Sequence, residues 1–215
     1  MSDFFLAALI SSRICHDLTG PVGAVSNGVE LLAEESDAAM QEQSLELLSF
    51  SARETSKRLQ FYRLCFGAAG GASALTSLGE AQRAAVGFFD GRKQNLNWPA
   101  DGLDALRVPQ PSVQLILNLI LLAGEALPRG GQIDVTMMPD GSGIKILASG
   151  RNAGLREDDL AALSGQTEQE ALDARTVQPW FAASISREIG AVISVETAIQ
   201  DQIQLQAGPL FRVSD

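Results

Sequence analysis

Apolar residues recur along the first part of the chain at the spacing of one helix face. Projected at about 100° per residue, the positions between residues 3 and 35 gather into one stripe, made of Ile14, Leu18, Val22, Val25, Val29 and Leu32. Pro21 interrupts this predicted helix, because proline lacks an amide donor and clashes with the carbonyl one turn back, at the level of Asp17, so we expect a kink beside His16. A second helix, capped by Ser36 or Asp37, is predicted to end near residue 66.

The two predicted helices form an antiparallel hairpin with more apolar surface than one hairpin can bury. The apolar positions of the second helix are Met40, Leu45, Leu47, Leu48, Leu59, Phe61, Leu64 and Phe66. A second copy of the chain would cover both stripes. The pattern therefore predicts a homodimer in which the hairpins form a four-helix bundle across a two-fold axis.

A run of small residues at 67–73 separates this hairpin from the rest of the chain. Its composition predicts a boundary between a helical domain at 1–70 and a second domain at 74–215. The second domain is predicted to hold helices at 77–89, 112–127 and 176–189, and strands at 95–98, 132–138, 144–148, 191–196 and 202–207. Helices interleaved with mainly antiparallel strands predict a two-layer α/β sandwich, so we expect the whole chain to be α+β.

The composition is that of an ordinary globular protein and excludes some functions. The 215-residue chain is 46% hydrophobic, and its formal net charge of -10 argues against nucleic acid as the main partner. No apolar run is long enough for a bilayer and the N-terminus lacks a basic secretory region, which predicts a cytoplasmic protein with no membrane partner. Cys15 and Cys65 are expected about 15 Å apart along the hairpin, too far for a disulfide.

Chemistry is concentrated at His16, the only histidine of the chain. It points away from the apolar stripe, on a face of small or polar residues: Ser12, Thr19, Gly20, Gly23 and Asn27. A lone histidine is most often a simple surface residue, but the cleared face favours close approach of a partner to the imidazole. No second histidine or cysteine cluster supports a metal site, and no nucleophile motif supports a catalytic triad. An exposed imidazole can itself act as a nucleophile and form a covalent intermediate.

The segment His-Asp-Leu-Thr-Gly-Pro at 16–21 resembles the H-box of histidine kinase dimerisation domains. In that box a phosphorylatable histidine precedes an acidic residue and, five positions on, a proline. The longer match over residues 12–32 is similar to the ChpT-type histidine phosphotransferases of alphaproteobacteria. The resemblance implies that His16 is the phosphoacceptor and that Asp17 has a supporting role. Gly20 stands where kinases carry a Thr or Asn tied to phosphatase action, which argues against a dedicated phosphatase activity.

The segment 114–131 looks like the N-box region of the Bergerat (HATPase-like) ATPase fold, but it lacks residues that bind nucleotide there. Asn118 is retained, but Leu122 stands where that fold carries the Mg²⁺-ligating Asn, and leucine has no oxygen ligand. Ala148 stands where the fold carries the adenine-binding Asp. Gln178-Pro179-Trp180 replaces the glycine-rich lid that would wrap the phosphates. We therefore expect a degenerate domain that keeps the fold and binds no ATP.

The resemblance implies a phosphorelay in which His16 passes a phosphoryl group between receiver-domain aspartates. The implied receivers are those of a CckA-like hybrid histidine kinase and of CtrA-like and CpdR-like response regulators. Mg²⁺ is expected on the receiver, so this chain should hold no cofactor and no metal. Two alternatives remain: an ATP-dependent histidine kinase, and a non-catalytic dimeric regulator that only binds receivers.

The face expected to dock a receiver surrounds His16 and extends to the second helix. Its members are Ser12, Arg13, Thr19, Gly20, Gly23, Asn27, Arg53 and Lys57. In an antiparallel hairpin Arg53, Lys57 and Arg58 lie roughly level with His16 and form a basic belt suited to an acidic receiver surface. A solvated polar face explains the same residues equally well.

Overall fold

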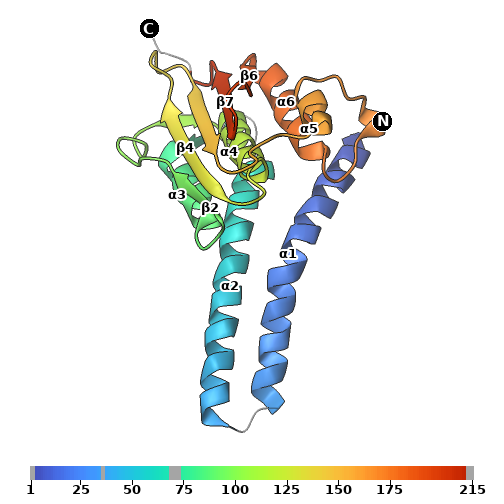
Figure 1. Cartoon of the computed structure of the whole chain (residues 1–215), viewed down its shortest axis with the longest axis vertical. Coiled ribbons are helices and arrows are strands. Elements are labelled where there is room, and N and C mark those ends of the chain that lie inside the picture. The colour runs from blue at the N-terminus through green and yellow to red at the C-terminus, as the bar shows by residue number, and fades with distance from the viewer. Residues whose placement is uncertain (1–2, 35–36, 68–73, 212–215) are drawn as a thin grey trace.

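The computed structural model describes residues 3–34, 37–67 and 74–211. Helices α1 (Asp3–Glu34) and α2 (Ala38–Phe66) form a long hairpin that projects from the C-terminal domain (Figure 1). α1 continues through Pro21 as one helix. Asp37, one of the two predicted caps, accepts hydrogen bonds from the backbone amides of Ala39 and Met40. The other, Ser36, lies outside the described residues.

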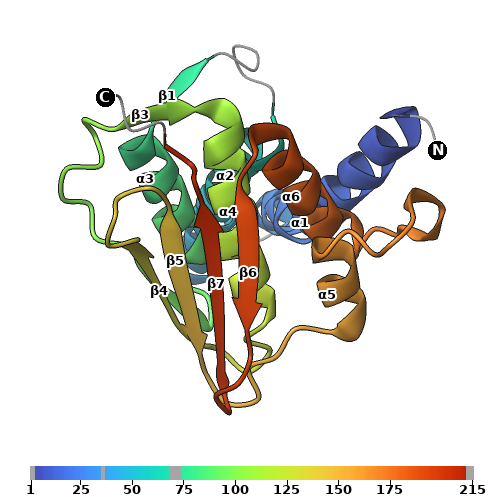
Figure 2. The ribbon, with the colours of Figure 1, turned by 90° about the horizontal axis from the view of Figure 1, so that it is seen from above.

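The C-terminal domain contains a five-stranded sheet of order β2-β4-β5-β7-β6. Its strands are β2 (Gln94–Asn97), β4 (Gly131–Met137), β5 (Ile144–Ser149), β6 (Val192–Glu196) and β7 (Gln202–Gly208). β2 and β4 are parallel, whereas the β4–β5, β5–β7 and β6–β7 pairs are antiparallel. One face of the sheet is covered by helices, as Figure 2 shows: α3 (Leu78–Phe89), α4 (Gln110–Glu125) and α6 (Val177–Ile189). This two-layer arrangement confirms the predicted α+β class.

α4 lies at the centre of the core. Its apolar residues are nearly continuous along the sequence, so they cover every face of the helix and all faces have to be buried. Every residue from Leu115 to Ala123 is buried. Alternate residues of β5 and β7 are buried too, as a sheet with one covered face requires: Ile144, Ile146, Ala148, Ile203, Leu205 and Ala207. The last turns of α2 join the same core through Phe61, Leu64 and Cys65, none of which is more than 3% exposed. The hairpin is thus anchored in the C-terminal domain by continuous apolar packing.

Four short elements were not predicted from the sequence. They are β1 (Leu75–Ser77), β3 (Arg107–Pro109), α5 (Glu157–Leu163) and a 3₁₀ turn, η1 (Gln169–Ala171). β1 and β3 pair with each other as a separate two-stranded sheet. Elements of three to seven residues are too short to show a repeating apolar pattern, so periodicity could not detect them.

The half of the hairpin away from the C-terminal domain carries large apolar side chains in water. Each of the following is between 49% and 53% exposed: Val29, Leu31, Met40, Leu45, Leu47 and Phe50. The two helices approach closely at Gly28, where an added Cβ would lie 3.3 Å from the Leu48 Cβ. Such an exposed apolar surface is what the predicted dimer interface requires. Across the described ranges, none of the helices combines the length and apolar content that crossing a membrane demands.

Candidate functional site

His16 lies on α1 and faces solvent, with its side chain 88% exposed. Ser12, Thr19 and Gly20 lie around it on the same helix. The space beside the helix is open, because a Cβ built on Gly20 or Gly23 would meet no neighbouring atom within 4 Å. The imidazole is therefore accessible to a partner protein along the face that the sequence keeps small.

Asp17 connects the imidazole to α2. Its Oδ1 lies 3.2 Å from His16 Nδ1, and its Oδ2 accepts a 2.7 Å hydrogen bond from the Tyr62 hydroxyl. Arg58 Nη1 donates a 2.7 Å hydrogen bond to the Asp17 backbone carbonyl. A carboxylate can only accept, so this arrangement places the proton of a neutral imidazole on Nδ1. Nε2 then carries the free lone pair that a nucleophile needs.

A cavity of about 220 Å³ lies behind Asp17, between the hairpin and helices α3 and α4. Arg13, Arg58 and Arg92 line it, and the Arg92 guanidinium lies 3.7 Å from the centre of the Phe88 ring. Burial, assisted by the charge of Arg58, lowers the pKa of Arg92. Glu125 also lines this cavity and pairs with Arg13, so Arg58 and Arg92 are the cations that make the potential next to the Asp17 carboxylate more positive.

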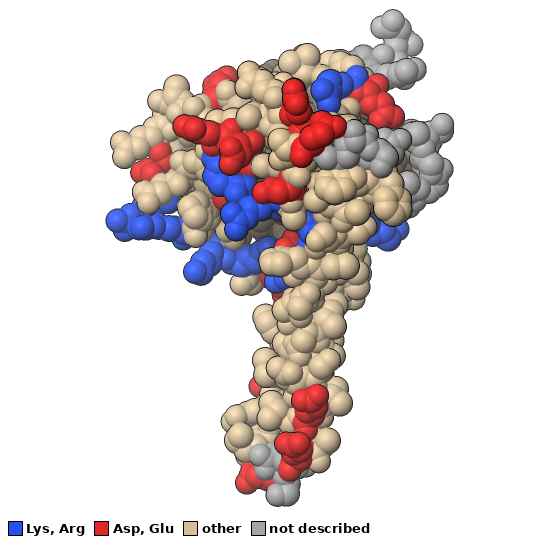
Figure 3. All heavy atoms as spheres, turned by 90° about the vertical axis from the view of Figure 1, so that its right-hand side faces the viewer, with Lys and Arg blue, Asp and Glu red and all other residues tan. Residues whose placement is uncertain are grey.

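A larger cleft of about 610 Å³ opens beside His16, between α1 and the C-terminal domain. Its opposite wall includes Arg156, Asp159 and Arg175. Arg156 donates two hydrogen bonds, of 2.8 and 2.6 Å, to the Asp159 carboxylate, and this pairing raises the pKa of Arg156. Figure 3 shows Lys and Arg gathered where the hairpin meets the C-terminal domain, below a group of Asp and Glu. The cleft thus brings charged groups of both domains to one side of the histidine.

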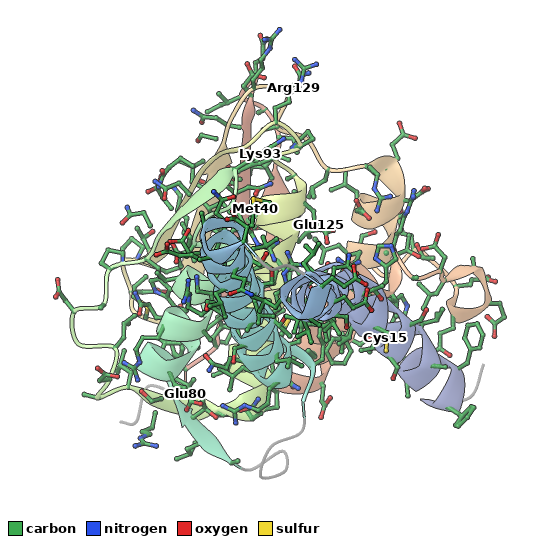
Figure 4. The ribbon with its side chains drawn as sticks, turned by 90° about the horizontal axis from the view of Figure 1, so that it is seen from below. Cys15, Met40, Glu80, Lys93, Glu125 and Arg129 are labelled. Atoms are coloured by element: carbon green, nitrogen blue, oxygen red, sulfur yellow. The ribbon has the colours of Figure 1, made fainter. Side chains whose placement is uncertain are left out.

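Arg13, predicted to face a receiver, instead joins α1 to the C-terminal domain. Its guanidinium forms an ion pair with Glu125 of α4 and donates to the backbone carbonyls of Ala174 and Arg175, at 3.4 and 3.3 Å. Only 11% of the Arg13 side chain is exposed, because it lies on the side of α1 that the domain covers. Figure 4 shows Glu125 and Cys15 on different sides of α1. Burial raises the pKa of Glu125, and the charge of Arg13 counteracts part of this rise.

Of the predicted basic belt, Arg58 reaches the site, whereas Lys57 is held elsewhere. The Lys57 ammonium pairs with Asp90 at 2.7 Å and with Glu54 at 3.1 Å. The hydrogen bond to Asp90, at the end of α3, is the main cause of the raised pKa of Lys57. Arg53 is exposed on α2. Of the three residues of the belt, Arg58 therefore holds Asp17, whereas Arg53 and Lys57 lie outside the site.

Tyr62 and Glu125 are among the site residues that were not predicted from the sequence. Tyr62 follows Arg58 by one helical turn, so Tyr62 could have been predicted from the register of the hairpin. Glu125 sits at the end of α4, and only the packing of the C-terminal domain against α1 brings it to Arg13. Both lie far along the chain from His16, where no local motif connects them to it.

Core residues occupy the positions where the sequence resemblance expects nucleotide-binding groups. Leu122 and Ala148, at two of these positions, are 0% and 1% exposed. Gln178 is fully buried and donates to the backbone carbonyl and the Oδ1 of Asn118, at 2.8 and 3.0 Å. In the part of the chain that the structure describes, no cluster of three or more His, Cys, Asp or Glu side chains could hold a metal ion. The residues present do not fit Mg-ATP.

Comparisons with known proteins identify the family of the chain. Residues 78–201 match the family model described as the histidine phosphotransferase C-terminal domain. The protein phosphotransferase ChpT of Brucella abortus (strain 2308) is 37% identical over 203 residues, which cover 94% of each chain. The solved structure of a bacterial phosphotransferase superposes with a TM-score of 0.81 at 35% identity, over 96% of this chain and 97% of that one.

The fold, the accessible histidine and these matches define a phosphotransferase of the phosphorelay class. The chain belongs to the histidine phosphotransferase family, and within it to the ChpT type. The family and the class of activity predicted from the H-box and the degenerate ATPase-like domain are thereby confirmed.

Proposed function

We propose that His16 is the residue that carries the phosphoryl group between receiver domains. The observation that carries this proposal is the exposed imidazole whose Nδ1 is held by Asp17, so that Nε2 is the free nucleophile. In the forward step a bond forms between Nε2 and phosphorus while the bond from phosphorus to the receiver aspartate breaks. The electron pair of that bond stays on the aspartate carboxylate. The reverse step returns the phosphoryl group to the aspartate of a second receiver.

The proposal includes no ATP step and no metal in this chain. Phosphoryl transfer is catalysed mainly by positioning and by neutralising charge, and Mg²⁺ usually supplies much of the latter. The buried Leu122 and Ala148 offer no ligand for it, so the receiver has to bring its own ion. The same burial disfavours the alternative of an ATP-dependent histidine kinase.

The receiver is proposed to dock over the face of α1 that surrounds His16. The residues of this face that stay free of the C-terminal domain are Ser12, Thr19, Gly20, Gly23 and Asn27. Arg13 and Lys57 are left out, because both are committed to ion pairs within the chain. By the resemblance to ChpT-type proteins, the partners are receivers of a CckA-like hybrid kinase and of CtrA-like and CpdR-like regulators.

A homodimer is proposed as the working form. The half-exposed apolar side chains of the distal hairpin, such as Leu45 and Phe50, support this proposal because each costs free energy in water. Pairing two hairpins as a four-helix bundle would bury them. Cys15 and Cys65 are both free thiols, which fits the proposed cytoplasmic location.

One assay separates the proposal from its two alternatives. The protein is incubated with labelled Mg-ATP alone, and separately with a receiver domain carrying a labelled aspartyl phosphate. We expect label on the wild type from the receiver only, and none on His16→Ala. Label from ATP would establish a kinase, and no label from either donor would leave a binding regulator. Label that persists on His16→Ala would refute His16 as the acceptor.

A further inference from the structure

Tyr62 and His16 bind the same carboxylate from opposite sides. The Tyr62 hydroxyl donates to Asp17 Oδ2 at 2.7 Å, and Asp17 Oδ1 lies 3.2 Å from His16 Nδ1. Each carboxylate oxygen therefore has its own partner, one on α2 and one on α1. Arg58 of α2 adds a hydrogen bond to the Asp17 backbone carbonyl, so α2 holds this residue at both its main chain and its side chain.

The Tyr62 side chain is held in place by packing, whereas the His16 imidazole is not. Tyr62 is 5% exposed, and its ring lies 5.8, 5.8 and 5.7 Å from the rings of Phe61, Phe66 and Phe88. The His16 side chain is 88% exposed and so has no packing of its own to fix its ring. Burial raises the pKa of Tyr62, with the Asp17 charge adding to the rise, so the phenol remains a hydrogen-bond donor.

We propose that Tyr62 is a positioning residue, which holds Asp17 so that the neutral His16 ring keeps its proton on Nδ1 and presents Nε2 to the phosphoryl group. This inference rests on the proposed role of His16 as phosphoacceptor. When Nε2 attacks, the ring becomes a phosphorylated imidazolium, and the Nδ1 proton stays in its hydrogen bond to Asp17. The Tyr62 hydrogen bond on Oδ2 keeps Oδ1 turned toward Nδ1, so that this hydrogen bond is maintained during transfer. A protonated ring is the better leaving group when phosphorus moves on to the second receiver.

Tyr62→Phe tests this role, because it removes the hydroxyl and keeps the ring in its aromatic cluster. Loss of a hydrogen bond to a charged group should slow phosphoryl transfer from a phosphorylated receiver by about tenfold or more. Thr55→Val is the matched control. It also removes a hydroxyl from α2, but that group donates only to the Ser51 carbonyl of its own helix, at 2.9 Å. The control should transfer at the wild-type rate.

The position of the imidazole proton gives a second readout, which a general loss of protein stability would not change. His16 is the only histidine of the chain, so the imidazole ¹⁵N spectrum of the labelled protein reports on this ring alone. We expect the Nδ1–H tautomer to dominate in the wild type and in Thr55→Val. In Tyr62→Phe the population should shift toward Nε2–H.

The outcomes distinguish this inference from the proposed function. If His16 accepts the phosphoryl group and Tyr62→Phe matches the wild type in both rate and tautomer, the positioning role is refuted and the carrier role stands. If His16→Ala is still labelled, the carrier role fails whatever Tyr62 does. Should Tyr62→Phe not fold, Asp17→Ala replaces it, since it removes the acceptor of both hydrogen bonds. A wild-type tautomer in Asp17→Ala would overturn the inference.

Discussion

Asn118→Ala should destabilise the protein without affecting any nucleotide chemistry. Asn118 is the one residue of 114–131 that matches the expected N-box position, and its side chain is fully buried. Its Nδ2 donates to the backbone carbonyls of Cys65 and Gln114, at 3.0 and 2.8 Å, and its Oδ1 accepts from Gln178 Nε2 at 3.0 Å. The side chain thus ties α4 to the end of α2 and to α6, which is a structural role.

The size of the effect follows from the partners that the alanine would leave behind. The carbonyl of Cys65 lies in the last turn of α2 and would lose the bond that Asn118 makes to it. Gln178 Nε2 keeps its 2.8 Å bond to the Asn118 backbone carbonyl, so that donor is only partly affected. One orphaned buried acceptor costs about 1–3 kcal/mol and each further hydrogen bond about 1 kcal/mol. The free energy of unfolding should therefore fall by about 3 kcal/mol.

Urea and thermal unfolding followed by circular dichroism measure this loss. For a chain of this size, the expected fall in Tm is about 6–12 °C. Asn97→Ala is the matched control, because Asn97 donates to Asp134 Oδ1 at 2.8 Å on the exposed surface. That control should change the free energy of unfolding by about 0.5 kcal/mol or less. A loss below about 1 kcal/mol in Asn118→Ala would show that the buried amide network does not hold the three helices together.

Three further predictions concern nucleotide, docking and assembly. Calorimetry should detect no binding of Mg-ATP at millimolar nucleotide, and a saturable heat signal would contradict the filled pocket around Leu122. Gly23→Leu should keep or raise stability by about 1 kcal/mol, yet slow transfer by up to about a hundredfold, since its side chain would enter open space beside His16. If that variant folds and transfers at the wild-type rate, receivers do not dock on this face. Phe50→Glu should weaken the dimer by about tenfold or more in light scattering, which an unchanged mass at all concentrations would refute.

The long elements could be predicted from the sequence because their patterns repeat over several turns. α1, α2 and α4 carry apolar positions over 32, 29 and 16 residues, long enough for periodicity to identify them. α5, with seven residues and an acidic first turn, gives no such repeat. His16 was identifiable for a different reason, since it is the only histidine and its helix face is kept small.

The partners of His16 were harder to predict than His16 itself. Asp17 is adjacent in sequence, but its second partner, Tyr62, is 45 positions away and depends on the register of the hairpin. Arg13 lies one turn from His16 and was assigned to docking, because the amphipathic pattern of α1 alone does not reveal which side a second domain covers. Its partner Glu125 is 112 positions away. Interactions of this kind are set by packing between domains, which no local pattern encodes.

The C-terminal domain holds α1 in place at two separate points. The Arg13 ion pair with Glu125 is one, and it is mostly shielded from water at the Arg13 end. The other is apolar, where Leu6 and Leu9 of α1 pack against a small cluster that includes Trp180 of α6. The cost of removing both charges from water offsets much of the attraction in such a shielded pair, so the combination with apolar packing is what fixes the helix.

The same domain fixes α2 through an aromatic cluster. Phe61 and Tyr62 are packed in the aromatic cluster with Phe88 of α3, so the position of the Tyr62 hydroxyl is determined by the domain core. α1 and α2 are thus anchored independently against one packed body, which sets the distance from Tyr62 to Asp17. Reaction rates are sensitive to displacements of about 1 Å, so a fixed distance between these two residues matters for transfer. The core of the C-terminal domain therefore sets the register of the two helices beside His16.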